Sequence, residues 1–169
     1  MNNISMKIEN LCKSFGNGDN KVDVISGANF SLNKGEFAAL VAPSGAGKTT
    51  LLMMLGCVLE PTSGKITIGD DVVYNNKWLV KDDRALRRKQ IGFIFQHHYL
   101  IPFLNIEENI TLLPYQNGED TKIVKKRVKE IMDYLDMSDK MYNMPSELSG
   151  GQNQRIAIAR ALANKPDIY

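Results

Sequence analysis

The chain has 169 residues, of which 43% are hydrophobic and 24% are charged, and its formal net charge is +2. These values fit one soluble globular domain, or one such domain cut short, and so small a net charge gives no reason to expect a nucleic-acid partner. The longest apolar run, residues 51–59, is interrupted by Gly56 and is too short to cross a bilayer. The first residues carry no secretory signal, so we expect a cytosolic protein.

The first elements are strands. Residues 6–15 alternate in hydrophobicity and predict a strand, residues 16–20 predict a turn-rich loop, and residues 22–32 predict a second strand with a bend at Gly27. Residues 37–41 form a continuous apolar run of strand length. Such a run is typical of a central parallel strand that is buried on both faces.

A helix and a hairpin follow. Apolar residues recur at helical spacing over residues 47–59, and the Pro and Gly of residues 60–64 end the pattern. Residues 65–73 predict a short antiparallel hairpin. Residues 82–89 predict a helix with acidic residues at its start, where they oppose the helix dipole. The basic run within it, residues 84–89, is better explained as a solvated face than as a nucleic-acid site.

The second half is mainly helical. Residues 91–95 predict another buried strand that ends before Gln96, and helices are expected over residues 106–113, 121–135 and 149–163. Residues 114–118 predict a loop. The apolar face expected on the helix 121–135 consists of Ile123, Val124, Val128, Ile131, Met132 and Leu135.

The cysteines and histidines give little functional signal. Cys12 and Cys57 lack metal-ligand spacing and are interpreted as small buried or half-buried side chains. His97 and His98 are adjacent, so they point in opposite directions on an extended segment, and no carboxylate or Cys cluster accompanies them. A surface or partner-contact role is therefore favoured over a metal site.

A glycine-rich loop at Ala42–Thr50 follows the apolar run and opens a helix. The pattern GxxxxGK(S/T) binds phosphate because backbone N–H groups surround the phosphate oxygens, the lysine adds a charge, and the hydroxyl reaches Mg²⁺. Lys48 is predicted to contact the β- and γ-phosphates and Thr49 to ligate the metal. The residues assigned to this cradle are Ser44, Gly45, Ala46, Gly47, Lys48, Thr49 and Thr50.

One position departs from the pattern. Ala42 stands where the motif has its first glycine, and glycine there permits backbone conformations that cost an L-residue about 1 kcal/mol or more. We therefore expect the loop to bind ATP, with room for some loss of affinity.

A second motif, Leu148-Ser149-Gly150-Gly151-Gln152, stands at the head of the last helix. A hydroxyl and small residues at a helix N-terminus leave N–H donors pointing outward. Together with the lysine loop, this motif resembles the ATP-binding subunits of ABC transporters over the whole chain. The segments Ile91–Gln96, Glu108-Asn109-Ile110 and Leu113-Pro114 are similar to the lipoprotein-release and macrolide-export branch.

The resemblance implies an α/β fold. It is a P-loop NTPase, RecA-like core with an antiparallel β subdomain and an inserted helical subdomain, truncated at the C-terminus. Residues 1–96 would form the core with the β subdomain, and residues 97–147 the helical subdomain. Residues 148–169 would hold the signature helix and the start of the Walker B strand.

The resemblance also assigns site residues. It implies that Phe15 stacks on adenine, although a packed strand residue is the alternative, and stacking suits any purine. Gln96 matches the Q-loop glutamine, which acts with Lys48 in catalysis and contacts Mg²⁺ or the attacking water. The signature residues that would contact the ATP of the opposite subunit are Ser149, Gly150, Gly151 and Gln152.

The implied partners are a second nucleotide-binding subunit, in a head-to-tail dimer, and a transmembrane permease at the inner face of the cell membrane. Residues 99–104 are apolar, and they mark either the permease contact or plain subdomain core. Substrate and direction of transport depend on the permease. A soluble ABC ATPase and a non-hydrolysing regulatory ATP-binding protein remain alternatives.

In relatives, an apolar strand ending in Asp-Glu follows a triplet like Lys165-Pro166-Asp167, and a histidine that contacts the γ-phosphate comes later. Neither the Asp-Glu pair nor that histidine occurs up to Tyr169. Because phosphoryl transfer depends on positioning and charge stabilisation, this chain alone is expected to bind ATP but to hydrolyse it poorly.

Overall fold

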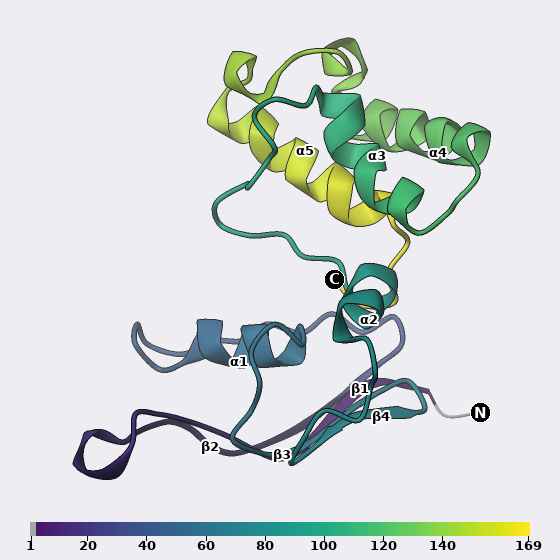
Figure 1. The fold of residues 1–169 in the computed structure, drawn as a ribbon. Helices are drawn as coiled ribbons and strands as arrows, with labels where there is room; N and C mark the ends of the chain where they lie inside the picture. The colour runs from purple at the N-terminus through teal and green to yellow at the C-terminus, as the bar shows by residue number, and fades with distance from the viewer. Residues whose placement is uncertain (1–2) are drawn as a thin grey trace. The chain divides into compact units, whose positions relative to one another are not determined.

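Four antiparallel strands in the order β2-β1-β3-β4 form a sheet in the first half of the chain (Figure 1). The strands are β1 (Ile4–Phe15), β2 (Val22–Asn33), β3 (Ser63–Ile68) and β4 (Asp71–Asn75). The structure, a computed structural model, describes residues 3–169, and the chain divides into two units, Met1–Arg84 and Ala85–Tyr169. The predicted strands before residue 33 and the predicted hairpin are confirmed.

Alternation along β1 builds one face of the sheet into a core. Met6 and Ile8 are buried and pair with Ile68 and Ile66 of β3. Lys7 and Glu9, which alternate with them along the strand, lie on the opposite face, as the two-residue period of a strand requires. On this outer face Glu9 pairs with Lys7 at 2.9 Å and with Lys65 at 3.4 Å.

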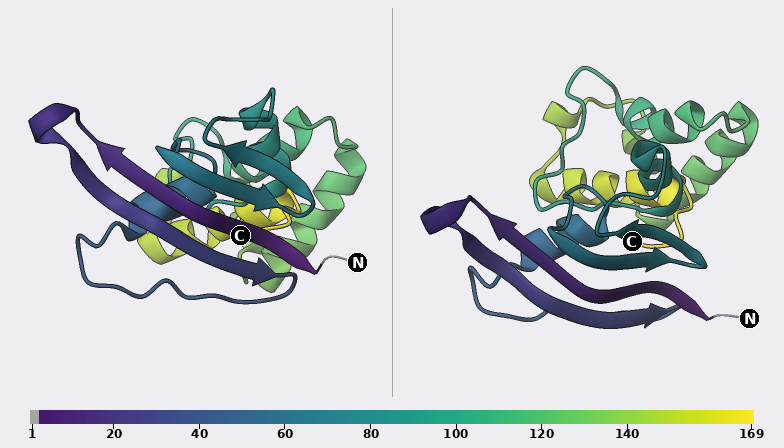
Figure 2. Two further views of the ribbon diagram at one scale, coloured as in Figure 1. Left: turned by 90° about the horizontal axis from the view of Figure 1, so that it is seen from below. Right: turned by 60° about the horizontal axis from the view of Figure 1, so that its bottom comes forward.

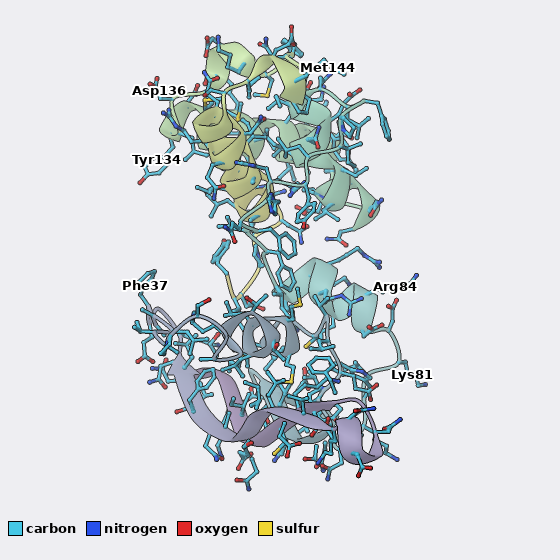
Figure 3. The ribbon with its side chains drawn as sticks, turned by 90° about the vertical axis from the view of Figure 1, so that its left-hand side faces the viewer. Phe37, Lys81, Arg84, Tyr134, Asp136 and Met144 are labelled. Atoms are coloured by element: carbon cyan, nitrogen blue, oxygen red, sulfur yellow. The ribbon has the colours of Figure 1, made fainter. Side chains whose placement is uncertain are left out.

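The predicted central strand at residues 37–41 is wrong. These residues form a loop without strand pairing that connects β2 to the following helix (Figure 2). The side chains of Phe37 and Val41 are 95% and 87% exposed, and Figure 3 shows Phe37 pointing away from the ribbon. An apolar run becomes a buried strand only where neighbouring strands supply hydrogen bonds on both sides, and the described residues supply none here.

Helix α1 (Lys48–Leu55) begins at the glycine-rich loop and contacts β2. It is shorter than predicted, because turns occupy residues 56–59, where Cys57 has a left-handed φ of 55°. Leu51 and Met54 of α1 are buried, as is Cys57, while Cys12 is half-buried. Both cysteines are free thiols, as the sequence indicates.

The second unit is a helical bundle. Helix α2 (Asp83–Gln90) leads into it from the end of the first unit, and α3 (Ile106–Gln116), α4 (Thr121–Tyr134) and α5 (Gly150–Ala163) pack on one another (Figure 1). Short 3₁₀ turns connect α4 to α5 at Ser138–Lys140 and Pro145–Glu147. No helix of the described residues is both long and apolar enough to traverse a membrane.

The core of the bundle comes from all three long helices and from the signature leucine. Val124, Val128 and Met132 of α4 are buried as predicted, but the prediction for Ile123 is wrong, since its side chain is exposed. The buried cluster consists of Ile106, Ile110, Val124, Val128, Met132, Met137, Leu148, Ile156, Ala159 and Ala163.

Two boundaries differ from expectation in this unit. Helix α3 continues through Pro114 to Gln116, where the sequence predicts a loop, because the proline ring is buried and only one backbone hydrogen bond is lost. The predicted strand 91–95 is reduced to one parallel bridge between Ile91 and Ile168. After it, Phe93 and Phe95 stack with ring centroids 5.2 Å apart instead of pairing in a sheet.

A buried asparagine fixes the entrance to the bundle. The Asn109 side chain is 1% exposed, and its Oδ1 accepts from the Ile101 amide at 2.7 Å. Its Nδ2 lies within hydrogen-bond distance of the carbonyls of Ile101, Leu104 and Asn105, at 2.9–3.1 Å. One side chain thus satisfies the backbone of the turn that precedes α3.

We expect Asn109→Leu to lower the free energy of unfolding of the helical unit by about 2–4 kcal/mol, because a buried amide and several carbonyls lose their partner. Urea unfolding followed by far-ultraviolet circular dichroism measures this change. Asn109→Asp keeps the acceptor for the Ile101 amide but turns a carboxylate oxygen toward the carbonyls of Ile101, Leu104 and Asn105, so it should cost at least as much. Equal stability of the leucine variant and the unchanged protein would contradict the expectation.

Candidate functional site

The glycine-rich loop turns sharply into α1. Gly45 and Gly47 both have a φ of +81°, a left-handed conformation that favours glycine, and α1 begins at Lys48 directly after them. A Cβ at Gly47 would lie 2.9 Å from Ile25 Cδ1 and 3.1 Å from the Val24 carbonyl oxygen, whereas a Cβ at Gly45 would meet nothing. The loop therefore packs closely on β2 at one glycine and is open at the other.

Lys48 is held against its own loop. Its Nζ donates to the carbonyl oxygens of Ala42 at 2.6 Å and Pro43 at 2.7 Å. An ammonium group has three donors, so these two bonds leave one for a further acceptor. The backbone N–H groups of the first turn of α1 have no acceptor within the helix. Charge and N–H donors thus gather at the start of this helix.

A cavity of about 350 Å³ lies at this helix start. Its lining contains hydroxyls, backbone and one lysine, but no carboxylate. The lining residues are Val24, Ser44, Gly45, Gly47, Lys48, Thr49 and Thr50. The predicted cradle is therefore brought together except for Ala46, which does not line the cavity. The motif does not predict Val24 of β2 as a lining residue, because Val24 reaches the loop only through the packing of β2 against it.

The backbone at Ala42 is less strained than its place in the motif suggests. Among the described residues, those other than glycine that have a positive φ are Asn10, Cys57, Asn76, Tyr99, Asp136 and Lys165. Ala42 is not one of them, so its methyl group meets no left-handed strain. The reason for expecting a weakened loop is therefore absent from this structure.

We expect Ala42→Gly to change the dissociation constant for ATP by less than about twofold, because no strain is relieved. The added freedom of the unfolded chain should lower stability by about 0.4–1 kcal/mol. Calorimetric titration and thermal unfolding measure the two effects. A much tighter complex in the glycine variant would show that the methyl group hinders the bound state.

Phe15 lies at the end of β1 with its side chain 44% exposed. The Lys13 Nζ lies 5.0 Å from the centroid of the Phe15 ring, within the range of a cation–π contact. The alternative of a fully packed core residue is therefore wrong. A half-exposed aromatic face fits the predicted stacking on adenine, which stays a prediction.

The signature residues form the capped tip of α5. The Ser149 hydroxyl accepts from the Gln152 amide at 3.3 Å, and the Gln152 Oε1 accepts from the Ser149 amide at 2.8 Å, which is a capping box. Leu148 is anchored in the helical core, whereas Ser149, Gly150 and Gly151 are exposed. A Cβ at either glycine would meet nothing within 4 Å. Leu148 thus fixes the tip to the helical core, while the two glycines face open space.

Gln96 and the two histidines lie on the irregular segment after Ile91. Gln96 and His97 are exposed and His98 is half-buried. No group of three or more His, Cys, Asp or Glu side chains among residues 3–169 is placed to hold a metal ion. The lysine loop belongs to the first unit, whereas Gln96 and the signature tip belong to the second.

The lysine loop and the signature helix both lie within the part of the chain that matches a known family. Residues 25–169 match the family described as ABC transporter. The ATP-binding protein LolD of the lipoprotein-releasing system of Bacteroides thetaiotaomicron is 40% identical over 163 residues, covering 96% of this chain and 72% of that protein. This chain belongs to the ABC transporter family.

Further relatives of this ABC transporter chain come from the same system and from a methionine import system. LolD of Aquifex aeolicus is 43% identical over 145 residues, which cover 85% of this chain and 63% of that protein. The methionine import ATP-binding protein MetN of Streptococcus agalactiae is 37% identical over 164 residues, covering 96% of this chain and 46% of that protein. The homologues are ATP-binding subunits of ABC transporters, and the resemblance to the lipoprotein-release branch is confirmed.

Solved ABC cassettes share the fold of this chain. A dimeric structure of the bacterial ABC transporter cassette MJ0796 has a TM-score of 0.84 at 34% identity and covers 95% of this chain and 70% of its own. A dimeric structure of the same cassette in a post-hydrolysis state with ADP and Pi matches equally well. These neighbours confirm the α/β P-loop NTPase fold with an antiparallel sheet and helices.

Proposed function

We propose that this chain couples ATP binding and hydrolysis to transport through a separate transmembrane permease. The observation that carries the proposal is the cavity at the start of α1, lined by Lys48, hydroxyls and backbone. Helix N-termini of this kind are anion sites, because N–H donors and the helix dipole both favour negative charge. The triphosphate of ATP has the charge and size that such a site accepts.

Each cradle residue then has a role. The N–H groups from Gly45 to Thr50 bind phosphate oxygens. Lys48 contacts the β- and γ-phosphates through its third donor, or through a donor that leaves the carbonyl of Ala42 or Pro43. Thr49 and Gln96 are the residues that would supply oxygens to Mg²⁺, and this cation would neutralise phosphate charge. Hydroxyl and amide oxygens suit this cation. Phe15 supplies the stacking face for adenine.

The cavity lining includes no carboxylate that could orient an attacking water. Positioning of that water is a large part of catalysis in phosphoryl transfer. We therefore expect the 169-residue chain to bind ATP and to turn it over slowly. In this proposal Lys48 and Gln96 act in catalysis. The core is formed by residues 1–96, the helical subdomain by residues 97–147, and the signature segment by residues 148–169.

The exposed signature tip is the second phosphate site of the proposal. Ser149, Gly150, Gly151 and Gln152 would meet the ATP held by the Lys48 loop of another copy, which gives a head-to-tail dimer. Support comes from the open space in front of both glycines and from the dimeric state of the similar cassettes. The permease contact at the inner membrane face would use residues 99–104, where Tyr99 and Phe103 are 66% and 77% exposed.

Titration of the chain with ATP, ADP and AMP tests the phosphate site. We expect ATP and ADP to bind and AMP to bind at least about tenfold more weakly, because AMP offers no β- or γ-phosphate to Lys48 and the N–H cradle. Isothermal calorimetry with and without Mg²⁺ gives these constants. Equal affinities for AMP and ATP would contradict a site built on the phosphates.

A substitution at the tip tests the dimer. We expect Gly151→Asp to abolish ATP-driven association, measured by sedimentation velocity, because the new carboxylate faces the triphosphate of the other copy. Binding of ATP to the monomer should not change. Gly151→Ala is the matched control, since it adds a methyl group into open space without charge. Undiminished association of the aspartate variant would rule out the tip as the interface.

A further inference from the structure

The segment after Gln96 contains a strained residue. Residues 92–101 have no helix or strand, and Tyr99 has a φ of 46°. A left-handed backbone is unfavourable for a bulky side chain and persists only where the surroundings impose it. The contacts around Tyr99 therefore determine the course of this segment.

Arg160 in the last turn of α5 imposes that conformation. Its Nη1 donates to the Tyr99 carbonyl at 2.7 Å and its Nη2 donates to the His98 carbonyl at 2.7 Å. The guanidinium is half-buried, and burial lowers the pKa of Arg160. A rigid planar fork that holds two successive carbonyls fixes two peptide planes at once.

The Tyr99 ring extends this restraint to both neighbours of Gln96. Its centroid lies 5.5 Å from that of Phe95 and 6.0 Å from that of His97, both in edge-to-face geometry. Gln96 is therefore flanked by two rings that touch Tyr99, and the backbone of Tyr99 is held by Arg160. We refer to Tyr99 and Arg160 together as the Tyr99–Arg160 clamp.

We propose that Arg160 is a positioning residue for Gln96, acting through the Tyr99–Arg160 clamp. The proposal rests on the proposed function in one respect, namely that Gln96 contacts Mg²⁺ with ATP. Because Arg160 and Ser149 belong to one helix, the clamp also joins the Gln96 segment to the helix that carries the signature tip.

The test uses Arg160→Met, which keeps the length but removes the donors, and Arg160→Lys, which keeps the charge but lacks the planar fork. In the methionine variant we expect Tyr99 to leave its left-handed φ, as reported by NMR scalar couplings across Tyr99. We call the ratio of the ATP dissociation constants measured without and with Mg²⁺ the Mg²⁺ factor. In Arg160→Met this factor should fall about fivefold, which is the effect of one lost interaction. Gln96→Ala should lower it by the same amount. Binding of ATP without Mg²⁺ should not change.

Combining Gln96→Ala with Arg160→Met should reduce the Mg²⁺ factor by less than about twofold beyond either change alone, since both act on one contact. Arg155→Met is the matched control, because Arg155 of the same helix also donates to a backbone carbonyl, that of Leu135 at 3.3 Å. It should leave the Mg²⁺ factor unchanged. A general loss of stability would instead lower ATP binding with and without the metal.

The proposal is overturned if Arg160→Met keeps both the φ of Tyr99 and the full Mg²⁺ factor, or if Arg155→Met lowers that factor equally. If the methionine variant does not fold, the lysine variant must show the same changes in smaller measure. Failure of the unchanged protein to bind ATP overturns the proposed function instead. The couplings across Tyr99 then still decide whether the clamp exists.

Discussion

Lys48→Ala is expected to weaken ATP binding by about 30- to 100-fold, equivalent to about 2–3 kcal/mol for a lost charge-assisted contact. Lys48 is the one charged side chain in the lining of the cavity, so no other lining residue replaces its charge. The carbonyls of Ala42 and Pro43 lose their donor in the variant, but Pro43 is exposed and Ala42 is half-buried, so water can replace it. The fold should survive.

Calorimetric titration measures the loss, and thermal unfolding checks the fold. Lys34→Ala is the matched control, since it removes the same charge from an exposed position in the same unit. It should leave ATP affinity within about twofold, because exposed charges at a distance are screened by salt. Unaltered ATP affinity of the Lys48 variant would overturn the phosphate site.

Gly47→Ala is expected to lower the free energy of unfolding of the first unit by about 2–4 kcal/mol and to remove most ATP binding. Two costs add at this residue. A φ of +81° is unfavourable for alanine, and its Cβ would lie 3.0 Å or less from Ile25 Cδ1 and Val24 Cγ1. Relief of this contact requires the start of α1 to move away from β2, which distorts the cradle.

Gly45→Ala separates the two costs, because Gly45 has the same φ but its Cβ would meet nothing. Its stability should fall by only about 1–2 kcal/mol, the cost of the left-handed conformation alone. Urea unfolding of both variants measures the difference. Equal losses would show that the packing of the loop on β2 contributes nothing.

Local patterns were sufficient to predict the parts of the site that are local in sequence. The spacing of Gly45, Gly47 and Lys48 predicts a turn into a helix, and Ser149 with Gln152 predicts a capped helix start; both are found. The hydrogen bonds that close these motifs join residues only a few positions apart. The alternation along β1 and β2 likewise predicts their strands correctly.

Predictions failed where the outcome depends on distant neighbours. The run at residues 37–41 has the composition of a strand, but pairing partners decide whether it becomes one. Pro114 predicts the end of a helix, but α3 continues through it, because burial of the proline ring within the bundle offsets the lost hydrogen bond. The contact of Arg160 with Tyr99 spans 61 residues, so no local pattern could reveal it. The roles assigned to the site residues stay predictions.

The exposed apolar loop at residues 37–41 has a consequence for the behaviour of the protein in solution. A short, uncharged apolar run without strand pairing can add to the same run of another molecule and build intermolecular sheets. Its hydrophobic side chains also favour capture by chaperones. Aggregation should therefore increase with protein concentration whether or not nucleotide is present.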